Sequence, residues 1–91
     1  MAAGTVHAVG SATLTSSAPG VKASVTVSAP TTVSTDVVLI TPTSAITDGR
    51  DGFGAHTFHV ENITTNAFNI VSDRNELKES VTFKFLTIST V

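Results

Sequence analysis

The chain has 91 residues, no cysteine, a formal net charge of −2 and a charged fraction of 13%. This length suits a single core, and the absence of thiols excludes disulfides and thiolate metal sites. The few lysine and arginine residues are scattered, so they form no basic stripe that could bind nucleic acid. We therefore expect one domain over residues 1–91, stabilised by oligomerisation because its core is small.

The N-terminal segment carries no recognisable targeting signal. Met1-Ala2-Ala3-Gly4 lacks the basic and long apolar regions of a signal peptide, and no run approaches the roughly 18 apolar residues of a membrane span. We expect a protein that is made in a cytoplasm, reaches its site without secretion and has no membrane partner.

Alternation of apolar and polar residues dominates the first third of the chain. Residues 5–15 are predicted to form a β segment, and Gly10 near its middle predicts a bulge or bend. Pro19-Gly20 is suited to the centre of a type II turn. Val21 to Ser28 then alternates without a break, which predicts a half-buried strand.

The middle of the chain contains one continuous apolar run, Val37 to Ile40, which ends at Thr41-Pro42. Such a run is typical of a strand that is buried on both faces, so we expect it to be central in a sheet or covered by a partner. The stretch from Thr47 to Gly54 holds two Asp-Gly pairs and is predicted to form a protruding loop.

Three further segments, residues 55–60, 67–71 and 81–88, bring the number of predicted strands to about six. Between them, Asp73 to Lys78 has the polar and charged residues suited to one short helical turn. The expected fold is therefore all-β, a single small β-sandwich or jelly-roll-like barrel of about six to eight antiparallel strands.

The last predicted strand is amphipathic only in its first half. Val81, Phe83 and Phe85 project to one face, whereas Leu86 and Ile88 project to the other, together with Thr82 and Lys84. Its distal half is apolar on both faces, and a lone thin sandwich would leave such a strand partly exposed to water.

The histidines are the first candidates for a metal site. His56 and His59 have a spacing that binds zinc on a helix, but in an extended segment residues three apart point to opposite faces. A metal would then need His7 or a carboxylate from elsewhere. We expect surface or interface histidines, with a pH-sensitive contact as the functional alternative.

The aspartates give no better case for a cofactor or for catalysis. Asp48 and Asp51 lack the spacing and the closing glutamate of a calcium loop, and these residues together with Asp73 are better explained by turn chemistry. No serine lies in a nucleophile elbow. We therefore predict no metal, no cofactor and no enzyme activity. Asn62-Ile63-Thr64 matches a glycosylation acceptor pattern, which has little meaning without secretion.

Aromatic residues point to contacts between apolar surfaces. Tyrosine and tryptophan are absent, so the usual sugar-binding and peptide-binding surfaces are disfavoured. Phe53 lies between two glycines and is either an exposed anchor or a loop residue folded back over the core. The suspected interface consists of Phe53, Val81, Phe83, Phe85, Leu86 and Ile88.

Three segments carry a resemblance to a known class of proteins: Gly10 to Thr15, Val25-Thr26-Val27, and Phe68 to Val71 followed by Val81 to Ile88. In pattern and composition the chain resembles the small β-rich modules of tailed-bacteriophage virion proteins. These modules occur as capsid decoration (cement) proteins and as head-fibre or tail-fibre tips. The resemblance implies a trimer, although the segment from Ser72 to Ser80 is more charged than that pattern.

Among these roles, the size of the chain favours capsid decoration, because 91 residues leave no room for a fibre shaft or an anchoring domain. We expect a structural protein of the virion surface, a homotrimer that binds the major capsid protein and stabilises the shell. The alternatives are a tail-fibre or receptor-binding adhesion module, and a filament or surface-layer β module.

Overall fold

The computed structural model describes residues 3–44, 58–73, 77 and 79–91. Within these ranges the chain forms six strands and no helix, which confirms the all-β prediction at the lower end of its strand count. The strands are β1 (Val6–Leu14), β2 (Ser24–Ser28), β3 (Val37–Pro42), β4 (Phe58–Thr64), β5 (Ala67–Ser72) and β6 (Val81–Ile88).

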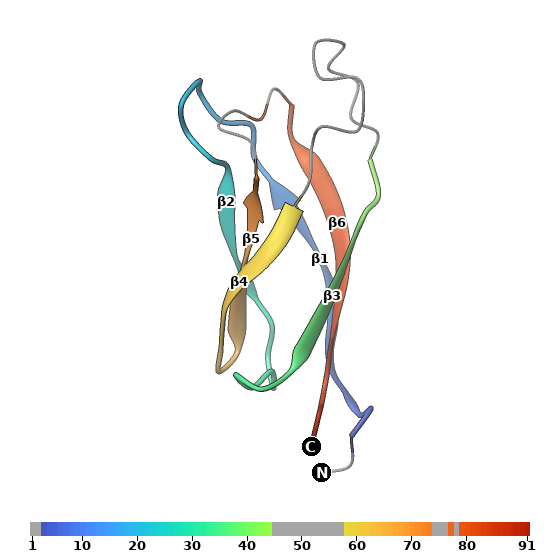
Figure 1. The fold of residues 1–91 in the computed structure, drawn as a ribbon. Coiled ribbons are helices and arrows are strands. Elements are labelled where there is room, and N and C mark those ends of the chain that lie inside the picture. Colours follow the sequence, from blue (N-terminus) through green and yellow to red (C-terminus); the bar gives the residue numbers. More distant parts are fainter. Residues whose placement is uncertain (1–2, 45–57, 74–76, 78) are drawn as a thin grey trace.

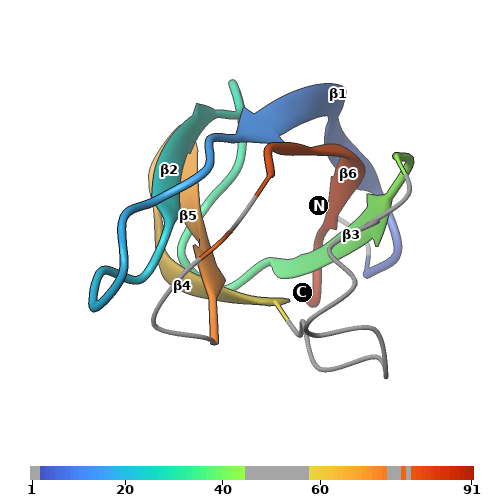
Figure 2. The ribbon, with the colours of Figure 1, turned by 90° about the horizontal axis from the view of Figure 1, so that it is seen from above.

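The six strands form two three-stranded antiparallel sheets that face each other as a sandwich (Figures 1 and 2). One sheet has the order β1-β6-β3 and the other the order β2-β5-β4. The first and last strands are therefore neighbours, and the start of β1 lies beside the end of β6 (Figure 1). Of the predicted helical turn at 73–78, residues 74–76 and 78 lie outside the described residues, as does the predicted loop at 47–54.

Alternation along the strands builds the core between the two sheets. Phe83 and Phe85 of β6 point inward, as do Phe68 and Ile70 of β5, and all four are buried. The ring of Phe68 meets that of Phe85 edge to face at 5.0 Å between centroids, and Phe58 meets Phe83 in the same way. Such pairs add to the stabilisation from area burial, so the aromatic residues hold the sheets together.

Small residues on β1 make room for these rings. Ala8, Gly10 and Ala12 face inward, and a Cβ atom at Gly10 would lie 2.8 Å from Cζ of Phe85. Gly10 pairs in regular register with Phe85, so a bulge at Gly10 is ruled out. The glycine is needed because the aromatic ring lies against the β1 backbone. The irregularity of β1 lies instead between Val6 and Ala8.

In contrast to the prediction, the apolar run in β3 is not buried on both faces. β3 is an edge strand, because β6 occupies the centre of the sheet and pairs with β1 and β3 on either side. Val38 and Ile40 pack against the core, whereas Val37 and Leu39 are 45% and 51% exposed. The predicted central position is therefore wrong, and cover by a partner stays a prediction.

The turn before β2 follows the prediction. The amide of Val21 donates a hydrogen bond of 3.0 Å to the carbonyl of Ala18, and Gly20 has a φ of 84°. A positive φ at this position is what a type II turn requires, and glycine adopts it without steric cost.

Candidate functional site

The outer face of the β1-β6-β3 sheet is apolar near the chain ends. Cross-strand pairing places its side chains in rows, each with one residue from each strand. The two rows nearest the chain ends form a six-residue cluster that we call the apolar patch. Its first row is Val6, Ile88 and Val37, and its second row is Val9, Leu86 and Leu39.

Much of the apolar patch faces solvent. Val9 is 74% exposed and Val6 is 50% exposed, while Leu86 and Ile88 are half-buried. A shallow depression of about 340 Å³ lies over β6, between Val9 on β1 and Leu39 on β3. Contiguous apolar surface of this kind, as opposed to single exposed residues, makes this face the candidate interaction site.

A β-bulge at His7 brings Val6 and Val9 to the same face. Val6 pairs with Ile88 and Ala8 pairs with Thr87, so His7 is an extra residue in β1. Without an extra residue, two positions three apart would point to opposite faces of the strand. The bulge restores the alternation, so that both valines point outward while His7 and Ala8 face inward.

The bulge also directs His7 to a buried partner. Nδ1 of His7 lies 2.6 Å from Oδ2 of Asp36, and the two side chains are 7% and 0% exposed. Oδ2 of Asp36 also accepts the amide of Val33 at 3.3 Å, whereas its Oδ1 is buried with no hydrogen-bond partner in the described part of the chain. The pair ties the start of β1 to the start of β3 and depends on both members, because burying either alone is costly.

A strained residue lies beside this pair. Thr31 has a φ of 68°, which is rare for a β-branched side chain. Its amide donates a 2.9 Å hydrogen bond to Oδ1 of Asn66, and its hydroxyl donates to the carbonyl of His7. These contacts hold the crossing from β2 to β3 against the β4–β5 hairpin, so the strain is part of the junction between the two sheets.

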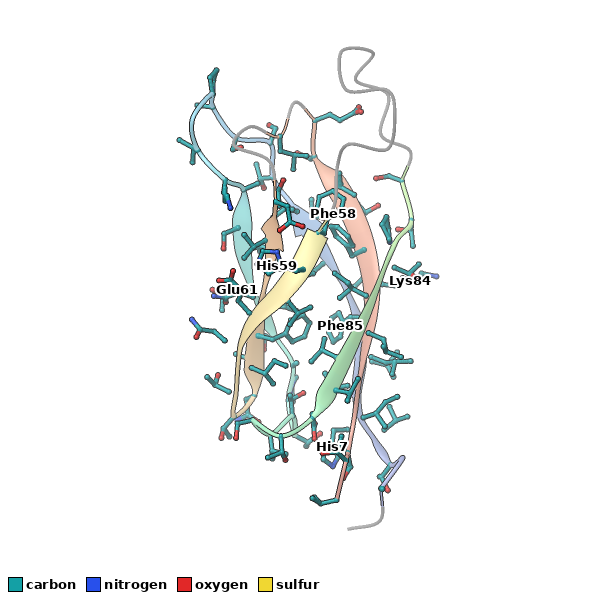
Figure 3. The ribbon with its side chains drawn as sticks, viewed as in Figure 1. His7, Phe58, His59, Glu61, Lys84 and Phe85 are labelled. Atoms are coloured by element: carbon teal, nitrogen blue, oxygen red, sulfur yellow. The ribbon has the colours of Figure 1, made fainter. Side chains whose placement is uncertain are left out.

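The outer face of the β2-β5-β4 sheet is polar by contrast. Residues that pair across it include Thr26, Asn69 and Glu61, and the serines of β2 are exposed on the same face. His59 and Glu61 are two residues apart on β4, so they lie on one side of that strand (Figure 3).

His59 lies between two carboxylates on this face. Its Nε2 contacts Glu61 and its Nδ1 contacts Asp73, which follows β5. The hydrogen bond to Glu61 is the main cause that raises the pKa of His59, opposed by partial desolvation and supported by the hydrogen bond and charge of Asp73 and by the charge of Glu61. His59 is 38% exposed, so the cluster is solvated.

The predicted interface residues separate into two groups. Val81, Phe83 and Phe85 are buried in the core of the chain, although Phe85 also borders the shallow depression over β6. Their inward direction follows from strand alternation, and Figure 3 shows Phe85 between the sheets and Lys84 pointing away from them. Leu86 and Ile88 lie on the outer face within the apolar patch. Phe53 lies outside the described residues.

Of the residues weighed as metal or catalytic candidates, the structure brings His59 and Asp73 into contact, and it places His7 apart from them. His7 and His59 lie in separate clusters on different sheets, and His56, Asp48 and Asp51 lie outside the described residues. Among the residues that the structure describes, no group of three or more histidine, aspartate or glutamate side chains is arranged to hold a metal ion.

Val6 and Val9 of the apolar patch are not among the predicted interface residues. Val37 and Leu39 belong to the run that is expected to be central or covered by a partner. The run from Val37 to Ile40 gave the clearest sequence signal, since only one of its faces can meet the core of a two-layer fold. The sequence also contains a signal for the contact between His59 and Glu61, because their spacing places two side chains on one face of a strand.

No protein-family model, curated protein or solved structure matches this chain. No helix in the described ranges has the length and apolar character needed to cross a membrane.

Proposed function

We propose that this chain is a structural assembly module of a virus particle, a capsid decoration protein that binds the outer shell as an oligomer, rather than an enzyme. The observation that carries this proposal is the apolar patch on the outer face of the β1-β6-β3 sheet. A small cysteine-free sandwich that leaves six apolar side chains together on one face is suited to stable contact with another protein surface.

The contrast with the other sheet supports this proposal. The outer face of the β2-β5-β4 sheet carries hydroxyl, amide and charged groups, which suit contact with water. A protein that coats a shell needs one adhesive surface and one solvated surface, and the two sheets supply one of each. The resemblance to phage virion modules supports the choice of a viral shell over other assemblies.

Electron microscopy with a gold-labelled antibody against this chain tests the proposal, applied to virions of the virus whose genome carries it. We expect label over the capsid surface in many copies. Label confined to the tail or fibre tips would overturn capsid decoration in favour of an adhesion module. The absence of the chain from purified virions would overturn the virion role.

A further inference from the structure

We infer that His59, Glu61 and Asp73 form a switch that is controlled by a single proton, which we call the proton latch. The latch is closed while the His59 ring is an imidazolium that contacts both carboxylates. Loss of the proton opens it, because Asp73 leaves the ring while Glu61 keeps its contact. The latch lies on the sheet opposite to the apolar patch, so it does not rest on the proposed function.

The contacts of the ring define its protonation state. Nε2 of His59 contacts Oε2 of Glu61, and Nδ1 contacts Oδ1 of Asp73. A carboxylate only accepts hydrogen bonds, so both ring nitrogens must donate, and only an imidazolium carries two N–H groups. A neutral ring would direct the lone pair of one nitrogen at a carboxylate oxygen. Near neutral pH the shared proton belongs to the ring, because a carboxyl group ordinarily binds it about two pH units more weakly.

The backbone determines which of the two contacts survives. His59 and Glu61 are two residues apart on β4, so their side chains share one face whatever the charge on the ring (Figure 3). Asp73 instead follows Ser72, the last residue of β5, and reaches the ring from another segment of the chain. A neutral ring therefore points its single N–H at Glu61 through Nε2, and the lone pair of Nδ1 repels Asp73. Water replaces the ring as the partner of Asp73, because both side chains are partly exposed.

The neighbouring strands add no other titratable group to the described part of this cluster. Cross-strand pairing places Val71 of β5 beside His59, and Ser24 of β2 beside Val71. The charged residue nearest to Ser24 along the chain is Lys22, which precedes β2, and a lysine keeps its charge near neutral pH. The ring of His59 is therefore the group whose charge changes when the latch opens.

The direction of the pH dependence follows from the two carboxylates. The hydrogen bond to Glu61 is the main cause that raises the pKa of His59, desolvation opposes it, and Asp73 supports it. The latch is therefore closed below about pH 6.5 and opens as pH rises through the folded-state pKa. Opening changes the cluster from one net negative charge to two, so the outer face of the β2-β5-β4 sheet becomes more acidic.

NMR spectroscopy of the whole chain from about pH 5 to about pH 9 tests the inference. Nuclear Overhauser contacts between the ring of His59 and the methylene group of Asp73 are expected at the acid end. They should disappear as the ring titrates, whereas the contacts with Glu61 persist. The chemical shifts of the ring nitrogens should identify the Nε2–H tautomer above the midpoint.

Two amide variants distinguish the latch from an ordinary surface contact. In Asp73→Asn the amide accepts a hydrogen bond from Nδ1–H or, after rotation, donates one to a bare Nδ1, so its contact with His59 is expected at every pH. In Glu61→Gln the amide does the same at Nε2, so the neutral ring is able to donate to Asp73 and this contact also persists. Glu79→Gln makes the same change in charge at a residue that does not contribute to the pKa of His59, and it is expected to behave like the wild type.

A wild-type contact between His59 and Asp73 that persists above the titration of the ring would overturn the inference, as would loss of the Glu61 contact in its place. Absence of the Asp73 contact at about pH 5 would contradict the closed state. Loss of the contact in both amide variants, as in the wild type, would show that the proton does not control it. Circular dichroism across the same range is expected to stay constant, and contact loss that coincides with global unfolding would also refute a local switch.

Discussion

The two sheets of this sandwich both direct apolar side chains into the core, but their outer faces differ in polarity. Both bury phenylalanine rings against each other, yet the β1-β6-β3 sheet exposes six clustered apolar side chains and the β2-β5-β4 sheet exposes polar groups around His59. Each sheet also has a histidine–aspartate contact, buried at His7 and solvated at His59. The difference shows that the core alone does not account for the apolar content of this chain.

The first test of this difference uses neighbouring residues on opposite faces of β6. Phe85→Asp places an unpaired charge in the core and is expected to remove more than about 4 kcal/mol of unfolding free energy, enough to unfold a domain of this size. Leu86→Asp places the same charge on the outer face and is expected to cost about 1 kcal/mol. Urea titration at low protein concentration measures both. Equal loss in the two variants would show that the apolar patch belongs to the folding core.

A second test compares the two histidine–aspartate contacts. Asp36→Ala removes the buried carboxylate that contacts Nδ1 of His7 and accepts the amide of Val33, so we expect a loss of about 2 kcal/mol of unfolding free energy. Asp73→Ala removes a solvated partner of His59, and the expected change in unfolding free energy is much smaller than that of Asp36→Ala. Thermal and urea unfolding of both variants provide the measurement. A larger loss for Asp73→Ala would contradict the assignment of the buried contact as the structural one.

The smallest expected effect is the titration of His59. Its raised pKa means that its contribution to stability is fully present below about pH 6.5 and is lost as pH rises through the folded-state pKa. Glu61→Gln removes the largest cause of the shift, so the pKa of His59 should fall toward its ordinary value. NMR titration of the ring protons measures this directly. A wild-type pKa at or below the ordinary value would refute the contacts with the two carboxylates.

Sequence patterning predicted the parts of the fold that depend on local alternation and turn chemistry. The inward direction of Phe83 and Phe85, the outward direction of Leu86 and the turn at Gly20 follow from such rules. The pairing of β1 with β6 joins the two ends of the chain, and period-two alternation does not specify which strands become neighbours. The edge position of β3 therefore could not be predicted.

The candidate site was harder to predict because it depends on a bulge. Residues three apart on a regular strand point to opposite faces, so Val6 and Val9 gave no sign of sharing a surface. The sequence suggests a bulge or bend at Gly10, but in the structure this glycine leaves room for the ring of Phe85. Only the register between β1 and β6 reveals that His7 is the inserted residue.

The central position of β6 has a consequence for synthesis. β6 follows the other five strands along the chain, yet β1 and β3 have no other strand partner among the described elements. A ribosome adds about 5–20 residues per second, so β1 and β3 have unpaired edges until β6 has been synthesised. The β2-β5-β4 sheet uses only strands made earlier, so it is able to form first. The apolar patch is thus the last part of the molecule to be assembled. Its two rows of side chains are therefore not clustered while the chain is still being synthesised.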